Sequence, residues 1–292
     1  MKHSAEFEDA KTGAKHRTEA KTLSAQQMQQ WQELGYLVLK QQIQQRHVQA
    51  LNQRLNQLWL QRRSLRAAIT IDAWLEEARS QRLLFSKAPN EARHSPYKLN
   101  DLYLEEPLVR AANLDPGLCR VLSELIDGEP LVCNSLNFEY GSQQSAHIDT
   151  LYMPPRKQNK LVVSWIALDA VDGSNGAVTY YPGSHLIPPF YFSTGKLNAV
   201  SAEMQNFHSY IGKELAARGI EEKTFHAEPG DVLIWHAQLL HGGSTITDKS
   251  KRRRSLVTHY FRREDYRHHF WRLQREHSTG SYIKRRHPGP TN

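Results

Sequence analysis

The second half of the chain is a series of short apolar segments separated by turn residues, and this pattern limits the fold more than any other feature. The segments are rich in Val, Ile, Tyr and Trp, with Gly, Pro and Asn between them. They cover residues 131–140, 161–168, 177–181, 231–235 and 255–261. Many short strands joined by tight turns are typical of an antiparallel β-sandwich or barrel. We therefore predict a mainly β fold, flanked by helices from the first part of the chain.

The first part of the chain carries helical patterns. We predict a short strand over residues 36–39 and helices over residues 25–34, 44–63, 71–79 and 108–126. Ser24 can cap the first helix and Gly35 can end it. Within the last helix, Asp115-Pro116 is either a break or the start of a fresh helix.

These patterns predict one domain with two terminal additions. Residues 1–22 are polar and lack hydrophobic periodicity, which predicts a disordered tail. The domain covers residues 23–265, with a helical part at 23–127 and a β core at 128–262. Residues 266–292 form a basic C-terminal extension.

The formal net charge of +8 comes from the C-terminal end. Residues 249–286 hold 13 Lys and Arg against 3 Asp and Glu, so the remainder is close to neutral. Such an end is either a solvated tail or a surface for nucleic acid, an anionic membrane or an acidic substrate. We interpret His268, His269 and His277 as solvated residues of a helix or tail.

Composition also limits the compartment. No apolar run approaches the roughly 18 residues of a membrane span, and the first twenty residues lack the apolar stretch of a secretory signal. Cys119 and Cys133 are too few for a disulfide framework. We therefore expect a cytoplasmic protein without membrane contacts, and the composition leaves its oligomeric state open.

His147-Ile148-Asp149 follows a predicted strand and is a candidate metal-binding pair. Residues two apart on extended backbone point to the same side, so the imidazole and the carboxylate can hold one ion. Such pairs also arise by chance, and His226-Ala227-Glu228 is a second match. The pattern alone therefore leaves a surface or capping pair as the alternative.

A third candidate ligand is His241, which follows an apolar strand at a Gly-Gly bend where the backbone can approach a ligand closely. Two His and one carboxylate form the facial triad of non-haem Fe(II) oxygenases, which leaves three coordination positions open. His236 competes for this role, although its place within the apolar strand favours a core residue.

A basic cluster at residues 251–254 runs directly into the strand at residues 255–261. Arg253 and Ser255 share one side of that strand and could bind a carboxylate together. A planar guanidinium matches carboxylate geometry with two parallel hydrogen bonds. The alternative is a solvated run of charge.

Taken in order, these motifs resemble the phytanoyl-CoA dioxygenase family of Fe(II)- and 2-oxoglutarate-dependent oxygenases. The resemblance extends from about residue 23 to residue 260. It rests on the opening helix with Gly-Tyr-Leu-Val-Leu, His147-x-Asp149, Trp165, Asn175-Gly176 leading to Tyr181-Pro-Gly-Ser-His185, Gly230-Asp231 through His241-Gly, and the Arg253-x-Ser255 strand.

The resemblance implies a double-stranded β-helix, or jelly roll, with N-terminal helices packed on it. It also implies that His147, Asp149 and His241 hold Fe(II). Arg253, helped by Ser255, would bind the distal carboxylate of 2-oxoglutarate.

Further residues of the cosubstrate pocket follow from the same resemblance. Trp165 would line the pocket, Gln144 would make a polar contact with the cosubstrate, and Lys98 would face the pocket. Arg252 is the rival of Arg253, because the spacing from His241 is one residue longer than the common family spacing.

The resemblance further implies an enzyme that uses O₂ and 2-oxoglutarate to hydroxylate, or otherwise oxidise, a small molecule, with release of succinate and CO₂. The substrate itself is not identified, and an anionic one is compatible with the basic residues expected around the pocket. Two alternatives stay open: an oxidative demethylase of nucleic acid that uses the basic C-terminal end, and a jelly-roll binding module without catalysis.

Overall fold

The computed structural model describes residues 22–76, 79–267, 272–277 and 279–290. Its helices are α1 (Ala25–Leu34), α2 (Gln45–Gln61), α3 (Pro107–Asn113), α4 (Pro116–Ile126) and α5 (Met204–Arg218). Its strands are β1 (Tyr36–Leu39), β2 (Thr70–Glu76), β3 (Arg79–Leu84), β4 (Tyr97–Asn100), β5 (Pro130–Phe138), β6 (Leu161–Ala167), β7 (Val178–Tyr180), β8 (Lys223–Phe225), β9 (Val232–His236), β10 (His241–Gly243), β11 (Ser255–Arg262), β12 (Arg272–His277) and β13 (Gly280–Lys284).

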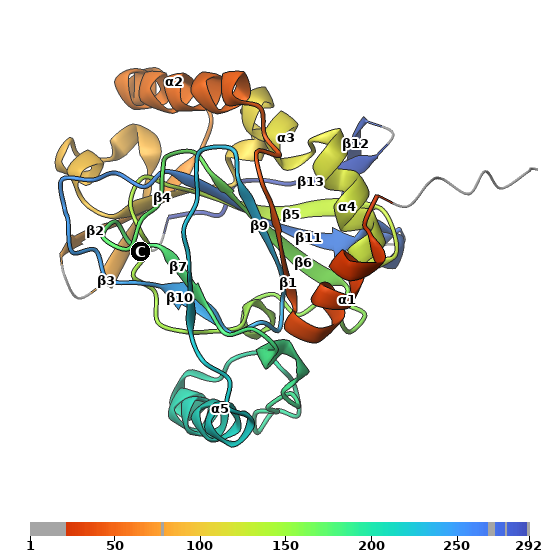
Figure 1. Cartoon of the computed structure of the whole chain (residues 1–292). Helices are drawn as coiled ribbons and strands as arrows, with labels where there is room; N and C mark the ends of the chain where they lie inside the picture. Colours follow the sequence, from red (N-terminus) through yellow and green to blue (C-terminus); the bar gives the residue numbers. More distant parts are fainter. Residues whose placement is uncertain (1–21, 77–78, 268–271, 278, 291–292) are drawn as a thin grey trace, which may run out of the picture.

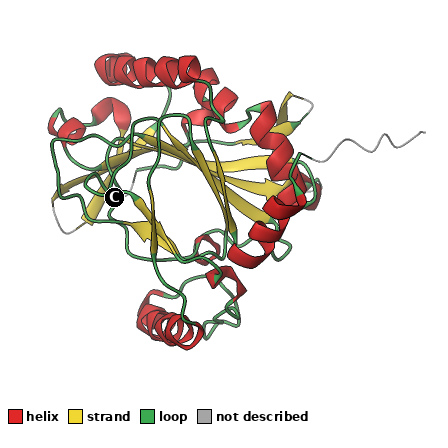
Figure 2. Cartoon of the chain, in the orientation of Figure 1, coloured by secondary structure: helices red, strands yellow, loops and turns green. Residues whose placement is uncertain are grey.

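Two sheets of mainly antiparallel strands make up the domain (Figure 2). Within the described residues, the larger sheet has the order β1-β9-β6-β11-β5-β4-β2-β3, and the smaller has the order β10-β7-β8. Helices α1 to α4 lie along the outer side of the larger sheet, whereas β7 and β10 lie on its other side (Figure 1). This arrangement has the mainly β architecture with flanking helices that the sequence predicts.

The central strands are buried on both faces. In β6 every residue is buried, and side chains alternate between two layers, as they must on a pleated strand. Val162 and Ile166 join the core against the helices, whereas Val163 and Trp165 join the core against the smaller sheet. A strand covered on both sides reads as a continuous apolar run, which is why these segments stand out in the sequence.

The ends of the N-terminal helices follow the predicted capping signals. The Ser24 hydroxyl accepts a hydrogen bond from the backbone N–H of Gln27, and Gly35 ends α1 in the left-handed conformation at φ 74°. The alternative at Asp115-Pro116 is decided in favour of a fresh helix start. Asp115 caps α4, and Pro116 is its first residue.

The predicted helix near residues 71–79 is wrong over its described part. Residues Thr70–Glu76 form β2, which pairs with β4 on one side and β3 on the other. The segment predicted to be helical therefore contributes strand β2 to the larger sheet. Short apolar segments fit both helical and strand periods, and pairing with a distant strand decided the outcome here.

The C-terminal extension is not a solvated tail where the structure describes it. Strands β12 and β13 form a hairpin, and β13 pairs in parallel with β5. Arg275 forms an ion pair with Glu129 at 2.7 Å, and Arg285 forms one with Asp101 at 2.7 Å. These arginines are engaged by acidic groups of the domain itself.

Two further sequence predictions concern the chain ends. His277 lies in β12 and not in a helix, whereas His268 and His269 lie outside the described residues. The predicted disordered tail at residues 1–22 also lies outside them, except for Thr22. Among the described residues, the structure contains no helix with the length and apolarity that a membrane span needs.

Arg254 connects the helical layer to the larger sheet. Its guanidinium donates to both carboxylate oxygens of Glu139, at 2.7 and 2.8 Å, and also to the side-chain oxygen of Asn56 in α2 at 2.7 Å. Both charged side chains are buried. The neighbouring Arg252 is instead 42% exposed and pairs with Asp169.

We expect Arg254→Ala to lower the free energy of unfolding by about 3–5 kcal/mol, because it removes the cation that donates two hydrogen bonds to the buried Glu139 carboxylate. The matched control is Arg252→Ala, for which the loss should stay below about 1 kcal/mol, since Arg252 is partly exposed and lies 4.0 Å from Glu139. Urea unfolding of both variants measures the difference. Equal losses would show that Arg254 does not connect the two layers as described.

Candidate active site

Two backbone hydrogen bonds bring His147 and His241 together. The N–H of each residue donates to the carbonyl of the other, at 2.9 and 3.0 Å, and this isolated bridge joins the loop after β5 to the start of β10. The two imidazole rings consequently lie 4.4 Å apart between centroids. Asp149 follows two residues after His147 and reaches the same place.

The Gly-Gly bend after His241 permits this close approach. A Cβ atom at Gly242 would lie 2.8 Å from the carbonyl oxygen of Gln144, and one at Gly243 would lie 2.6 Å from the Ser142 hydroxyl. Real Cβ atoms do not approach so closely, so any other residue would push the loop before His147 away. The predicted role of this bend is thus explained by two contacts.

The three side chains form a candidate metal site. The ligand atoms of His147, Asp149 and His241 all lie within 4.8 Å of one another. The Nδ1 atom of His147 lies 2.9 Å from the carbonyl oxygen of Ser145, and that of His241 lies 3.0 Å from that of Leu239. Because a carbonyl only accepts, both Nδ1 atoms carry a proton, which leaves Nε2 as the nitrogen of each ring that can bind a metal.

The protonation states suit a metal ligand set. Burial, together with the neighbouring His241, lowers the pKa of His147 to about 4, so this imidazole is neutral near pH 7. Burial alone would raise the pKa of Asp149, but His241 and His259 outweigh that effect and hold it below its usual range. Two neutral imidazoles and one carboxylate are the donors of a facial triad for Fe(II), so the residues present fit this metal.

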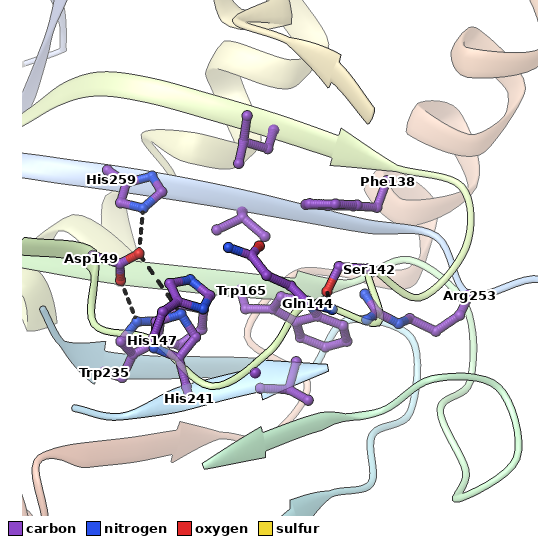
Figure 3. A pocket seen from close by; sticks show the side chains of 14 residues that line it. Phe138, Ser142, Gln144, His147, Asp149, Trp165, Trp235, His241, Arg253 and His259 are labelled. Carbon is purple, nitrogen blue, oxygen red and sulfur yellow. Dashed lines mark hydrogen bonds and ion pairs between the residues drawn. The ribbon is translucent and has the colours of Figure 1, made fainter. Parts of the chain in front are cut away.

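The triad lies in a pocket with a cavity of about 70 Å³. Arg253, Trp165 and Gln144 also line it, and Figure 3 shows Arg253 on the side opposite Asp149. The remaining lining residues are Leu136, Phe138, Ser142, Val178, Trp235, Gly242, Val257 and His259.

Arg253 is a buried cation without an acidic partner among the described residues. Its side chain is 2% exposed. The Nε and Nη2 atoms donate to the carbonyl of Gly176 at 2.9 and 2.7 Å, and Nη1 donates to the Ser255 hydroxyl at 2.8 Å. Burial lowers the pKa of Arg253 to about 10, which still leaves it charged at neutral pH. The guanidinium carbon lies 5.3 Å from the ring centroid of Trp165.

The structure separates the other predicted residues. Arg252 points to Asp169 and away from the pocket, and Ser255 reaches the pocket only through its contact with Arg253. Lys98 does not line the pocket: it lies on β4, where its Nζ atom is 3.8 Å from Asp72.

Two alternatives for the metal site lie elsewhere. His236 is buried on the face of β9 that points to α1, with its ring 5.9 Å from that of Trp31. His226 and Glu228, the second His-x-carboxylate match, are both exposed.

Sequence reasoning did not identify Trp235 and His259, which both line the pocket. The Trp235 indole N–H donates to Oδ2 of Asp149 at 2.8 Å, and His259 Nε2 lies 3.3 Å from Oδ1. A signal was available for His259. Every second residue of an extended segment points to the same side, so the side chains at 253, 255, 257 and 259 share one side.

The metal-free protein should lose stability as the pH falls from about 6.5 to about 4. Burial lowers the pKa of His147 to about 4 and that of His236 to about 3, whereas an unfolded histidine titrates near 6.5. Within this window the unfolded state binds protons that the folded state does not, so the free energy of unfolding decreases as the pH falls.

We expect His147→Gln to make this decline shallower by roughly 2–3 kcal/mol between about pH 7 and about pH 4. Urea unfolding of the metal-free protein across this range measures it. The control is His47→Gln, which changes an exposed histidine and should preserve the full decline. If His147→Gln left the slope of unfolding free energy against pH unchanged, the His147 imidazole would not be neutral in the folded protein as assigned.

Comparison with known proteins identifies the family. Residues 31–255 match the family described as phytanoyl-CoA dioxygenase (PhyH). A probable phytanoyl-CoA dioxygenase of Caenorhabditis elegans is 24% identical over 260 residues, which cover 83% of this chain and 76% of that protein.

Solved structures share the fold. The non-haem alpha-ketoglutarate-dependent carbocyclase SnoK from nogalamycin biosynthesis has a TM-score of 0.62 at 17% identity, over 82% of this chain and 84% of that one. Iron-bound EctD from S. alaskensis has a TM-score of 0.61 at 17% identity, over 84% and 78%. These likenesses confirm the predicted jelly roll. With the family match over most of its length and the His-Asp-His site in place, the chain belongs to the phytanoyl-CoA dioxygenase (PhyH) family and is an Fe(II)- and 2-oxoglutarate-dependent dioxygenase.

Proposed function

We propose that this dioxygenase hydroxylates a small organic molecule, with Fe(II) held by His147, Asp149 and His241 and 2-oxoglutarate held by Arg253. One observation carries the proposal. A single pocket has three buried ligand groups on one side and, on the other, a buried guanidinium without an acidic partner among the described residues. A metal ion would bind the three ligand groups, and a dicarboxylate would supply the anionic partner of the guanidinium.

The three ligands prepare the site before anything binds. Both imidazoles present the Nε2 lone pair, because their Nδ1 atoms are engaged by backbone carbonyls. The Asp149 carboxylate stays ionised, so the set carries one negative charge toward a divalent cation. When bound, the iron and 2-oxoglutarate supply the oxidising chemistry, in which 2-oxoglutarate yields succinate and CO₂ and O₂ oxidises the substrate.

Arg253 has the hydrogen-bonding capacity that a carboxylate needs. A guanidinium carries five N–H groups, and the three hydrogen bonds to Gly176 and Ser255 leave two of them. Two N–H groups match the two oxygens of a carboxylate. A buried unpaired charge is costly, so an anionic ligand would also remove an electrostatic penalty. The face of Trp165 bounds this end of the pocket.

Gln144 supplies the polar contact in this proposal, because it lines the pocket between the two ends (Figure 3). Lys98 has no part in it, since its ammonium group is directed to Asp72.

The substrate is a small molecule in our proposal, and hydroxylation is the proposed outcome. An anionic substrate stays a prediction, because Arg253 is the only lysine or arginine among the described residues that line the pocket. We also propose a reducing compartment such as the cytoplasm, which is supported by Cys119 and Cys133 being buried and unpaired.

Arg253→Ala should weaken 2-oxoglutarate binding by about 10- to 100-fold, the loss expected for hydrogen bonds to a charged group, while Fe(II) still binds. The measurement is an anaerobic titration with Fe(II) and 2-oxoglutarate, followed through their weak visible charge-transfer band. Arg252→Ala is the control, because Arg252 faces Asp169. If 2-oxoglutarate affinity fell in Arg252→Ala and stayed at the wild-type value in Arg253→Ala, the roles of the two arginines would be reversed.

Asp149→Ala should abolish both metal binding and 2-oxoglutarate turnover, since it removes the only carboxylate of the described triad. Metal content after dialysis and succinate release measure the two effects. Asp172→Ala is the control, because that aspartate is exposed and pairs with Lys251. Full succinate release from Asp149→Ala would rule out the proposed ligand set.

A further inference from the structure

We infer that Trp235, on β9, is a positioning residue that orients two of the three metal ligands, Asp149 and His241. This assignment rests on the proposed function, which makes these two residues ligands. Trp235 is a positioning residue and not a ligand, because an indole N–H offers only a donor.

The first contact of Trp235 selects one oxygen of Asp149. Its indole N–H donates to Oδ2 at 2.8 Å. The other oxygen, Oδ1, lies 3.8 Å from Nε2 of His241, on the side of the histidine ligand atoms. A carboxylate whose Oδ2 is held in this way cannot rotate freely about its Cβ–Cγ bond. The geometry therefore assigns Oδ1 as the oxygen that coordinates the metal, and Oδ2 as the oxygen held by Trp235.

The second contact of Trp235 restrains His241. The indole and imidazole rings lie 4.7 Å apart between centroids, at an interplanar angle of 43°. His241 is also held at its edge by the Nδ1 hydrogen bond to Leu239. The hydrogen bond to Leu239 therefore holds the edge of the His241 ring, and the indole of Trp235 restrains its face.

Trp235 is itself held rigidly. Its backbone lies in a central strand, opposite Tyr36 of β1 and Val163 of β6, and its side chain is 3% exposed. Groups built on a paired strand hold a ligand more precisely than groups on a loop. In Figure 3 the indole lies beside Asp149 and His241.

A second donor completes the arrangement around Asp149. His259 Nε2 lies 3.3 Å from Oδ1. An imidazole N–H at Nε2 can donate to this oxygen, because a carboxylate oxygen is a hydrogen-bond acceptor. At 3.3 Å this bond is longer than that of Trp235, and we assign it a smaller share of the positioning.

The sharpest test is Trp235→Phe, which keeps an aromatic ring against His241 and removes the N–H. Co(II), a visible-absorbing substitute for Fe(II), is titrated into the metal-free full chain. We expect affinity to fall by about 10- to 100-fold, as when other partners of metal ligands are removed. The visible Co(II) spectrum should also change, because the carboxylate is free to turn. A packing role alone would not alter that spectrum.

The matched control is Trp59→Phe. The indole of Trp59 is also buried and donates to the hydroxyl of Tyr97, in the core between α2 and the larger sheet. The Trp59→Phe variant should lose stability, while its Co(II) affinity and its visible Co(II) spectrum stay at wild-type values. If Trp235→Phe does not fold, 3-benzothienylalanine at position 235 keeps the bicyclic shape, replaces only the N–H by sulfur, and should give the same loss.

The outcomes separate this inference from the proposed function. Affinity within about twofold of wild type and an unchanged spectrum in Trp235→Phe, or in its benzothienyl counterpart, would overturn the positioning role while the ligand set stands. Wild-type protein that binds no Co(II) would overturn both.

For His259, Gln in its place can still donate to Oδ1, whereas Leu cannot. We expect His259→Gln to bind Co(II) more tightly than His259→Leu. The ratio of these two affinities should be smaller than the fold loss of affinity in Trp235→Phe. Equal affinities of these two variants would remove His259 from the assignment.

Discussion

The pair of backbone hydrogen bonds between His147 and His241 is the interaction on which the site depends. It joins the loop after β5 to the beginning of β10, two segments that are far apart in the sequence. With these residues in register, both imidazoles face the same space, and Asp149 enters it two residues later. The glycines at 242 and 243 are a condition of this contact, because a side chain at either position would meet the loop before His147.

Three consecutive arginines have three different roles, and period-two geometry separates Arg253 from its two neighbours. Arg252 forms a solvated ion pair with Asp169, Arg253 enters the pocket, and Arg254 turns to Glu139 under the helical layer. The larger sheet is covered on both sides, so opposite side-chain directions lead to two different buried environments. Desolvation leaves Arg253 available for an anion and makes Arg254 dependent on its carboxylate.

Sequence patterns predicted local features well. Capping residues placed the ends of α1 and gave the start of α4 as one of two alternatives, and apolar runs placed the central strands, because both signals are confined to a few neighbouring residues. The patterns failed at β2 and at the C-terminal hairpin. In both segments the strand is stabilised by pairing with a partner distant in the chain, β4 for β2 and β5 for β13. No local period reveals such a partner.

The sequence by itself determined the donor types and their spacing: a His-x-Asp pair, a histidine before two glycines, and an arginine two residues before a serine. The His-x-carboxylate pattern alone could not choose between His147-x-Asp149 and His226-x-Glu228, and only the resemblance to the family favoured the first pair. The tertiary structure gives the physical reason, because it pairs His147 with His241 and leaves His226 and Glu228 exposed. It also brought Trp235 and His259 to Asp149. Chemistry is carried by residue types, but a metal site needs atoms a few ångströms apart, and that proximity comes from strand pairing between distant segments.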